Sequence, residues 1–371
     1  MRRKFFCFVA ALFFGSVASP AVAQTAKPSW QIEWDRVLEG AKKEGKVVAS
    51  IPPSPELRKG MEEAFTKRFG VVLESFPARG ASLIRRIVDE SRAGIRYFDV
   101  HVGGTESIVK GLLPEGVLEH VEPFLVLPEV KDPKQWWGGH IWIDDAKRFI
   151  YAFAAYQTQT INYNSDLVKP QEVRSFDDLL DPQWHGRIGL SDPRTPGSGA
   201  SIWSYLLMVK GEEYLKRLVA QKLLIGRDLR LLAENLAKGR VAITLGIGYA
   251  EFHPYIKAGL PVKTLPTPKE GLYATAGYGS LTIIKNPPHP NATRLFVNWL
   301  LSKEGQEVFT RAMGEPTRRL DVETKWLKEV GVLAAKDGLT LEQFYKMENQ
   351  SEERVYKVRD PGAALARKLL D

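Results

Sequence analysis

The sequence has almost no cysteine, and its single cysteine, Cys7, lies in an apolar run near the start of the chain. The rest of the chain therefore excludes disulfides, zinc–thiolate sites and cysteine nucleophiles. The six histidines show no His-x-x-x-His or Glu-paired spacing, so no zinc site is indicated. A G-x-S-x-G elbow, a dinucleotide fingerprint and a Walker-type phosphate loop are also missing. These absences argue against an enzyme, and they predict neither a metal nor a cofactor.

Long apolar runs are missing after the first residues. Three positive residues precede an apolar run over 5–17, and the small-x-small pattern Ala21-Val22-Ala23 follows it. This order predicts a signal peptide over residues 1–23, cleaved before Gln24, because the run is too short to span a bilayer. A retained membrane anchor is the alternative. We expect a protein of the periplasm.

Charge of one sign is only in mild excess. The formal net charge of +8 falls to +5 when the three positive residues of the predicted leader are removed. An excess this small, spread along the chain, favours anionic partners weakly, and no basic stripe indicates nucleic acid. The remaining length is that of two ordinary domains.

Three strands in the first part of the chain are each followed by a helix. They are predicted at 47–51, 71–76 and 98–102 from short apolar runs bounded by Pro or Gly. Strands that alternate with helices predict a parallel sheet with right-handed crossovers, whose ligands bind at the carboxyl ends of the strands.

A second series of strands and helices begins at 176–180, and a single helix is predicted over 292–310. Extended segments at 149–163 and 261–275 connect the two series. This pattern predicts an α/β protein of two lobes, each a mostly parallel sheet flanked by helices, joined by two extended crossings around a cleft. The predicted boundaries are 24–158 with 266–371 for lobe I, and 159–265 for lobe II.

The stretch from Arg187 to Ala200 is the best candidate for a binding loop. It runs from a short strand through a Pro/Gly/Ser loop into an amphipathic helix. Free N–H groups at the start of that helix favour an anionic or strongly polar group, and Arg194 lies in the same loop. A plain surface turn is the alternative.

The strand ends of lobe I carry similar loops. Arg79 and the small residues after it precede a predicted helix, as Arg194 does, so we expect the two arginines to hold an anion from opposite sides of the cleft. A tyrosine in each lobe, near a crossing or a glycine-rich turn, is a further candidate. The predicted ligand-binding residues are Ser50, Arg79, Gly80, Ser82, Gly104, Thr105, Arg194, Gly197, Ser198, Tyr249 and Tyr278.

Several segments resemble the extracellular solute-binding proteins of ABC importers, in the order in which that family has them. These segments include Ile161-Asn162-Tyr163-Asn164, Asp177-Asp178-Leu179-Leu180, Asp192-Pro193 and Gly197-Ser198-Gly199. The resemblance covers nearly the whole chain after the leader. It implies the two-lobed type II periplasmic binding protein fold and is strongest to the subgroup of the ferric-iron-binding proteins.

The resemblance leaves the ligand open. Members of the family bind ferric iron, phosphorylated sugars, phosphonates, polyamines or thiamine, and the iron-binding members carry adjacent tyrosines in the segment that matches 245–255. Here that segment contains Tyr249 and Tyr255 but no adjacent pair. We therefore expect a small, anionic organic solute rather than ferric iron.

The expected function is that of a monomeric periplasmic receptor, without cofactor, which captures a small-molecule ligand and delivers it to an ABC permease in the inner membrane. Closure of two lobes around a ligand is a population shift, since contacts with both lobes exist only in the closed state. A ferric-iron receptor and a periplasmic sensor domain remain the alternatives.

Overall fold

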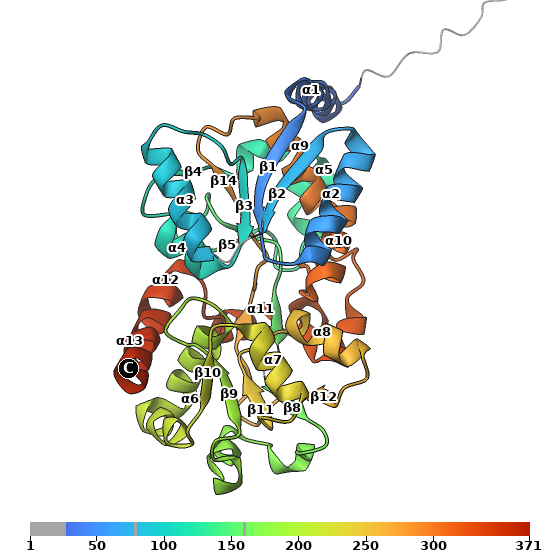
Figure 1. The fold of residues 1–371 in the computed structure, drawn as a ribbon. Coiled ribbons are helices and arrows are strands. Elements are labelled where there is room, and N and C mark those ends of the chain that lie inside the picture. Colours follow the sequence, from blue (N-terminus) through green and yellow to red (C-terminus); the bar gives the residue numbers. More distant parts are fainter. Residues whose placement is uncertain (1–26, 78–79, 159–160) are drawn as a thin grey trace, which may run out of the picture.

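The computed structural model describes residues 27–77, 80–158 and 161–371, so the predicted leader and Arg79 lie outside the described residues. Figure 1 shows two lobes, one above the other, with α1 (Ser29–Glu44) on top of the upper lobe and the carboxyl end of the chain in the lower one. Among the described helices, none combines the length and the apolar character needed to cross a membrane.

The upper lobe, lobe I, is built on a mixed sheet with the order β2-β1-β3-β14-β6-β5, in which β4 also pairs with β14. β1, β2 and β3 are parallel and β14 runs antiparallel to them. The predicted parallel start of the sheet is therefore confirmed. The strands are β1 (Lys46–Ile51), β2 (Val72–Pro77), β3 (Val100–Gly103), β4 (Leu118–Glu119), β5 (Ile141–Trp142), β6 (Tyr151–Ala152) and β14 (Ser280–Ile284).

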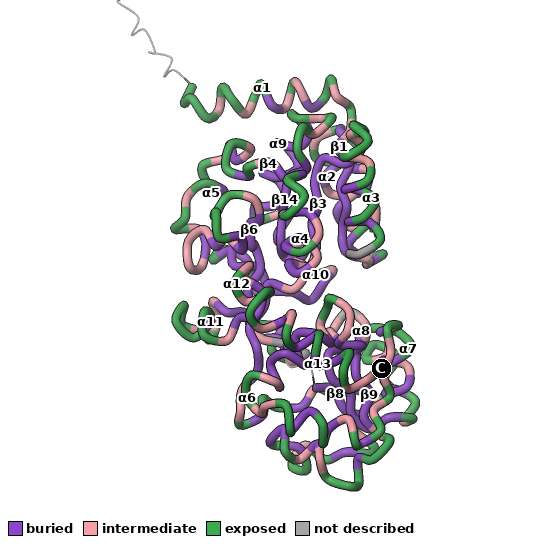
Figure 2. The backbone as a smooth tube through the Cα atoms, turned by 90° about the vertical axis from the view of Figure 1, so that its left-hand side faces the viewer, coloured by how far each residue is buried: buried purple, intermediate pink, exposed green. Residues whose placement is uncertain are grey.

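Helices cover both faces of this sheet, which explains why five consecutive residues of β1 are buried rather than alternate ones. Figure 2 shows the buried residues following the strands of both lobes. The lobe I helices are α2 (Pro55–Phe69), α3 (Gly80–Arg92), α4 (Thr105–Gly111), α5 (Pro128–Lys131), α9 (Pro290–Leu301) and α10 (Lys303–Met313).

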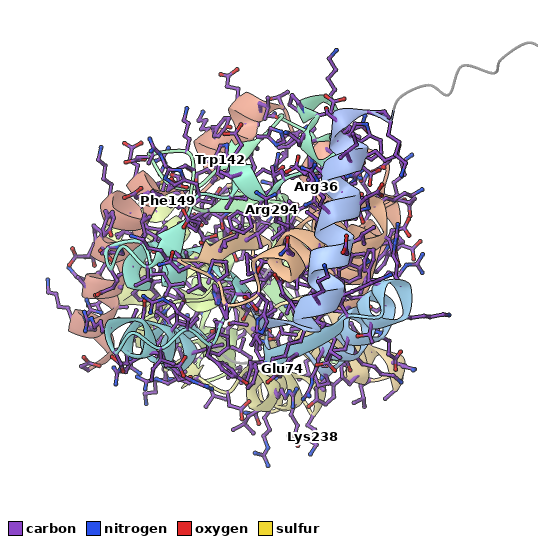
Figure 3. All side chains as sticks on the ribbon, turned by 90° about the horizontal axis from the view of Figure 1, so that it is seen from above. Arg36, Glu74, Trp142, Phe149, Lys238 and Arg294 are labelled. Carbon is purple, nitrogen blue, oxygen red and sulfur yellow. The ribbon has the colours of Figure 1, made fainter. Side chains whose placement is uncertain are left out.

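The helix predicted over 292–310 is two helices, α9 and α10. Ser302 separates them with an extended backbone, and its hydroxyl accepts from the N–H of Gly305 at 3.4 Å. α1 packs on α9, and the Glu44 carboxylate caps the start of α9 by accepting from the N–H groups of Asn291 and Ala292. Arg294 extends this contact by donating to Glu33 at 3.0 Å, and Figure 3 shows Arg294 beside α1.

The lower lobe, lobe II, has a five-stranded sheet with the order β10-β9-β11-β8-β12. Its predicted first element at 176–180 is a 3-10 turn rather than a strand, because Ser175 and Asp178 close a capping box around it. The lobe II elements are β8 (Ile161–Asn164), β9 (Ile188–Ser191), α6 (Ser198–Ala220), β10 (Leu224–Gly226), α7 (Leu229–Ala237), β11 (Ile243–Leu245), α8 (Tyr249–Lys257) and β12 (Val262–Thr264).

The two extended crossings pair with each other between the lobes. β7 (Tyr156–Thr158) lies between β13 (Ala274–Thr275) and β15 (Val332–Ala334), antiparallel to both. Three strands rather than two therefore form the connection, and β15 comes from a part of the chain in which no strand was predicted.

The carboxyl-terminal residues return to lobe II. After α11 (Leu341–Met347) and α12 (Glu352–Arg354), a π-helical turn leads into α13 (Asp360–Leu370), which packs along α6. Leu365 and Ala366 belong to the lobe II core, and the indole N–H of Trp203 donates to the carbonyl of Gly362 at 2.9 Å. The assignment of all of 266–371 to lobe I is thus wrong for its last helix, whose apolar face is buried by α6.

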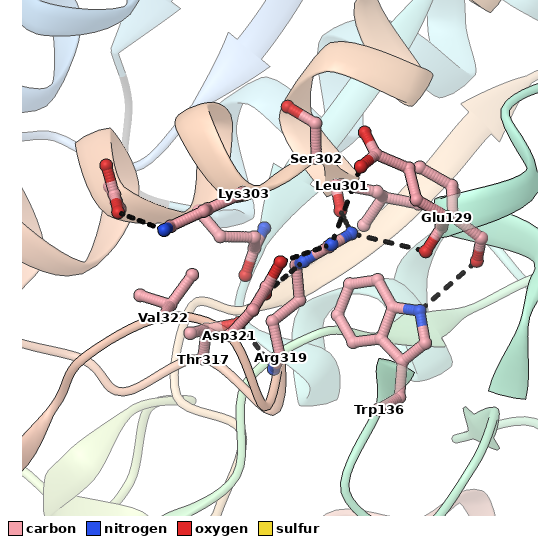
Figure 4. A network of polar contacts seen from close by, with 12 residues as sticks. Glu129, Trp136, Leu301, Ser302, Lys303, Thr317, Arg319, Asp321 and Val322 are labelled. Atoms are coloured by element: carbon pink, nitrogen blue, oxygen red, sulfur yellow. Dashed lines mark hydrogen bonds and ion pairs between the residues drawn. The ribbon is translucent and has the colours of Figure 1, made fainter. Parts of the chain in front are cut away.

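Two adjacent buried arginines fasten the segment after α10 to lobe I. Arg319 pairs with Asp321 at 2.8 Å and donates to the carbonyl of Leu301 at 2.9 Å, as Figure 4 shows. Arg318 donates to the carbonyls of Ala152, Trp137 and Gly139. Both guanidinium groups lie against the Trp136 ring, so this segment is held by polar and cation–π contacts together.

Candidate functional site

A cavity of about 230 Å³ lies between the lobes. Lobe I contributes the loops after β1 and β3, lobe II contributes the loops after β9 and β11, and the crossings form its back. These are the carboxyl ends of strands, where α/β sheets bind their ligands.

The start of α6 lines the cavity and has no side-chain cap. Its N-cap is Gly197, which has no side chain to accept from the first turn, and no acidic residue follows within that turn. In contrast, Ser54 caps α2 through the N–H of Leu57, and α8 carries Glu251 in its own first turn. Of these three helices, α6 therefore offers the strongest site for an anion.

Close packing explains the glycine at the second position of α6. A Cβ at Gly199 would approach the carbonyl oxygen of Ser191, at the end of β9, to 2.2 Å. Only glycine lets this helix begin so near the strand. Beside it, the Ser198 hydroxyl donates to the carbonyl of Gly246 after β11, so the loop is tied to two strand ends.

Arg359 reaches the start of α6 from the π-helical turn Val355–Arg359. The side chain is buried and forms an ion pair with Glu106 of lobe I. Nη2, which pairs with Glu106, also donates to the Gly197 carbonyl of lobe II, and Nη1 donates to the Ser201 hydroxyl. One guanidinium group thus bridges both lobes at the cavity, and π-helical turns are frequent at functional sites.

Three residues that line the cavity each have a buried side-chain nitrogen without a hydrogen-bond partner within the described residues. These nitrogens are Nε of Arg359, Nε2 of Gln350 and Nε2 of His101. The oxygen of the Gln350 amide accepts from Thr275 at 2.9 Å, so its NH₂ group is left over. A buried polar group without a partner costs about 1–3 kcal/mol, which makes these atoms candidates for ligand contacts.

Ser50 lies beside one ring nitrogen of His101. Burial lowers the pKa of His101 to about 4, so the ring is neutral at pH 7. The Ser50 hydroxyl lies 2.7 Å from Nδ1. When Ser50 donates to Nδ1, the proton of the ring lies on Nε2, which is buried beside Gly103. Ser50 therefore acts behind the cavity wall and not on its surface.

Tyrosine and carboxyl groups also line the cavity. Tyr156, Tyr249, Tyr278 and Glu315 line it. Burial raises the pKa of Glu315 to about 8, although this carboxyl accepts a hydrogen bond from the Tyr278 N–H at 2.8 Å. Burial also raises the pKa of Tyr249 and, far more, that of Tyr156. At pH 7 the cavity carries little negative charge from these groups.

Six of the predicted site residues line the cavity: Gly104, Thr105, Gly197, Ser198, Tyr249 and Tyr278. Gly80 and Ser82 lie in α3 and are not among the described lining residues, and Ser82 is exposed. Arg79 lies outside the described residues.

Arg194 does not line the cavity, in the described chain, and its expected role is corrected. Its guanidinium pairs with Asp192 at 2.8 Å and with the carboxyl-terminal residue Asp371 at 2.7 Å. Burial alone would raise the pKa of Asp192, but hydrogen bonds from Arg194 and Arg227 lower it to about 2. A carboxylate two residues away in the same loop therefore takes the donors that an anionic ligand would need.

A family model for bacterial extracellular solute-binding proteins matches residues 46–312. The chain belongs to this family. This chain is therefore a solute-binding protein, and the family is described as extracellular.

Similar proteins support the same fold. An uncharacterized protein of Haemophilus influenzae is 30% identical over 144 residues, which are 36% of this chain and 39% of that protein, so the match spans well under half of its length. Iron-bound HitA from Pseudomonas aeruginosa has a TM-score of 0.65 at 17% identity and covers 88% of this chain and 99% of its own. AfuA from Actinobacillus pleuropneumoniae, with fructose-6-phosphate bound, has a TM-score of 0.62 at 20% identity, covering 88% and 98%.

The sequence gives little sign of the other lining residues of this solute-binding protein. Arg359, Gln350 and Glu315 lie far along the chain from the loops they meet and belong to no motif. For Arg194, in contrast, the sequence did contain a signal. Asp192 lies two residues before it, and this spacing allows the local ion pair that the structure shows.

Proposed function

We propose that this protein captures a small anionic organic solute between its lobes, in the periplasm, and delivers it to the permease of its ABC importer. The observation that carries the proposal is the start of α6, which faces the cavity with no side-chain cap and no acidic residue in its first turn. The N–H groups and the dipole of the first segment of α6, which ends at the break at Gly211, favour a phosphate or carboxylate group.

The buried donors around this helix support the same ligand. Arg359 and Gln350 line the cavity, and their buried Nε and Nε2 atoms have no partner among the described residues. Hydrogen bonds from such groups to an anion are charge-assisted and selective for planar or tetrahedral oxyanions. Since Arg359 already pairs with Glu106, its contribution is donor geometry more than net charge.

Ferric iron is the second candidate, because several tyrosines line the cavity and HitA has iron bound. Phenolates are strong ligands for a hard cation once they are deprotonated. Against this, burial raises the pKa of Tyr156 and of Tyr249, and no tyrosine adjoins Tyr249 in the sequence. The anionic solute therefore agrees better with the cavity.

Native mass spectrometry of protein purified without denaturation tests the proposal. We expect a retained small molecule whose fragments include a phosphate or carboxylate group. Titration with a ferric chelate is the matching control, since two phenolates on iron would give a strong visible absorption band. A saturable band that is lost in Tyr249→Phe, together with a retained iron atom and no organic ligand, would contradict the proposal.

A further inference from the structure

Glu106 places a fixed negative charge beside the start of α6. It lies in the first turn of α4 in lobe I and pairs with Arg359, and the two side chains are buried, with 6% and 5% of their surface exposed. Figure 1 shows α4 at the lower edge of lobe I, facing α12 and α13. One nitrogen of Arg359, Nη2, donates both to Glu106 and to the carbonyl of Gly197, the N-cap of α6. The carboxylate is therefore one guanidinium group away from the helix end that would hold the anion.

The ion pair leaves little of the charge of Arg359 for a ligand. Nη2 is shared between Glu106 and Gly197, and Nη1 donates to the Ser201 hydroxyl in the first turn of α6. Nε is buried and has no partner among the described residues. A guanidinium group whose charge is already balanced offers geometry and hydrogen bonds, but it attracts a further negative charge only weakly.

The other charged residues that line the cavity, within the described chain, add no excess of positive charge. They are Asp192, Arg227, Glu251 and Glu315. Arg227 pairs with Asp192 at 2.9 Å. Burial raises the pKa of Glu315 to about 8, and burial lowers the pKa of His101 to about 4, so at pH 7 neither adds a full charge. The acids of the described lining therefore at least balance its arginines.

The helix end can thus compensate only a small negative charge. The N-terminus of a helix carries about half an elementary positive charge. The attraction of an anion to this partial charge rises in proportion to the charge of the anion, whereas the cost of taking the anion out of water rises with the square of that charge. A second negative charge on the same group therefore costs more than it gains, and the Glu106 carboxylate repels it as well.

We propose that Glu106 is a specificity-determining residue, which restricts the cavity to solutes with a singly charged oxyanion. This inference rests on the proposed function and narrows its substrate class. Carboxylates, sulfonates, sulfate esters and phosphodiesters meet the requirement. Phosphate monoesters do not, because they carry about 1.5 to 2 negative charges at pH 7.

Calorimetry with two probes of similar shape tests the charge limit. Methyl sulfate carries one negative charge, and methyl phosphate carries nearly two at about pH 7.5, since the second pKa of a phosphate ester is about 6. We expect the wild-type protein to bind methyl sulfate at least as tightly as methyl phosphate. In Glu106→Gln the affinity for methyl phosphate, relative to that for methyl sulfate, should rise about tenfold, because the repelling charge is gone and that of Arg359 is no longer balanced.

Matched variants separate charge from folding. In Glu106→Gln the amide oxygen can still accept from Arg359, and thermal unfolding checks that the fold is kept. Glu106→Asp keeps the charge and should keep the wild-type ratio of the two affinities. Glu115→Gln removes a carboxylate that pairs with Arg92 on the surface of lobe I, where water screens it, so this ratio should stay within about twofold of the wild-type value.

The wild-type protein alone gives a second measurement, which depends on no variant. Methyl phosphate gains its second charge between about pH 5 and pH 7.5. Its affinity relative to that of methyl sulfate should therefore fall at least about threefold over this range. The methyl sulfate titration at the same pH values corrects for groups of the protein that titrate there.

The outcomes distinguish the two proposals. A wild-type preference for methyl phosphate, or a ratio of affinities that changes neither with pH nor in Glu106→Gln, would overturn the role of Glu106 and leave the anionic solute intact. If neither probe binds at millimolar concentration, the anion site at the start of α6 is refuted, and the role of Glu106 with it.

Discussion

Buried arginines in two regions of this protein differ in how completely their donors are used. In the segment after α10, every guanidinium nitrogen of Arg318 and Arg319 donates to a carbonyl or carboxylate oxygen. At the cavity, Arg359 is buried as well but keeps Nε without a partner in the described chain. A buried cation with all donors satisfied stabilises the fold, whereas one with a spare donor in a cavity indicates a ligand.

The largest expected effect is the loss of a fully satisfied arginine. Arg318→Ala removes the donors to three carbonyls and the cation–π contacts with Trp136 and Tyr151. We expect unfolding in urea to show a loss of about 3 kcal/mol or more. Arg36→Ala, on the exposed face of α1, is the control and should cost less than about 0.5 kcal/mol. Similar losses in both variants would contradict the structural role.

Glu315 is a buried acid, and its raised pKa makes the free energy of unfolding depend on pH. Burial raises the pKa of Glu315 to about 8 from 4.5, so the folded protein keeps a proton that the unfolded chain releases. Its contribution to stability is complete below pH 4.5 and is lost as the pH rises through 8. We expect the wild type to lose roughly 2–4 kcal/mol relative to Glu315→Gln between pH 5 and pH 8, at about 1.4 kcal/mol per pH unit. Urea midpoints at both pH values measure this, and parallel pH curves for the two proteins would rule it out.

Removal of the incompletely satisfied arginine should affect binding as well as folding, because it also leaves the buried Glu106 carboxylate unpaired. Arg359→Ala takes donors from the cavity, so its affinity for the co-purified solute should fall about tenfold to a hundredfold in calorimetry. Arg359→Lys keeps the charge but not the planar fork and should recover only part of that loss. If both variants bind as the wild type does, the spare donor has no role in the ligand site.

The smallest effect is expected at Arg194, whose donors are occupied by Asp192 and Asp371. Arg194→Ala should leave the affinity for the same solute within about twofold, because Arg194 does not line the cavity of the described chain. Stability should fall by about 1 kcal/mol, since Arg227 still pairs with Asp192. A tenfold loss of affinity would restore the role first expected of this arginine.

Local patterns in the sequence were sufficient to predict the first strands and the loop that leads into α6. The run Val47–Ile51 and the glycines around Ser198 have short-range causes, namely burial on both faces and close helix–strand packing. Arg359 meets Ser201 across 158 positions of the chain, and no periodicity encodes such a contact. Glu315 is likewise acidic in sequence but holds its proton near neutral pH only because the fold buries it.

The packing of α13 on α6 places the two described ends of the chain in different lobes. Figure 1 shows α1 on top of the upper lobe and the carboxyl end at the side of the lower one. A donor fluorophore on Ser29 and an acceptor on Asp371 would therefore report the separation of the lobes directly, without a label near the cavity. These two positions would therefore report closure of the lobes on solute binding. No cysteine among the described residues would compete with an engineered thiol.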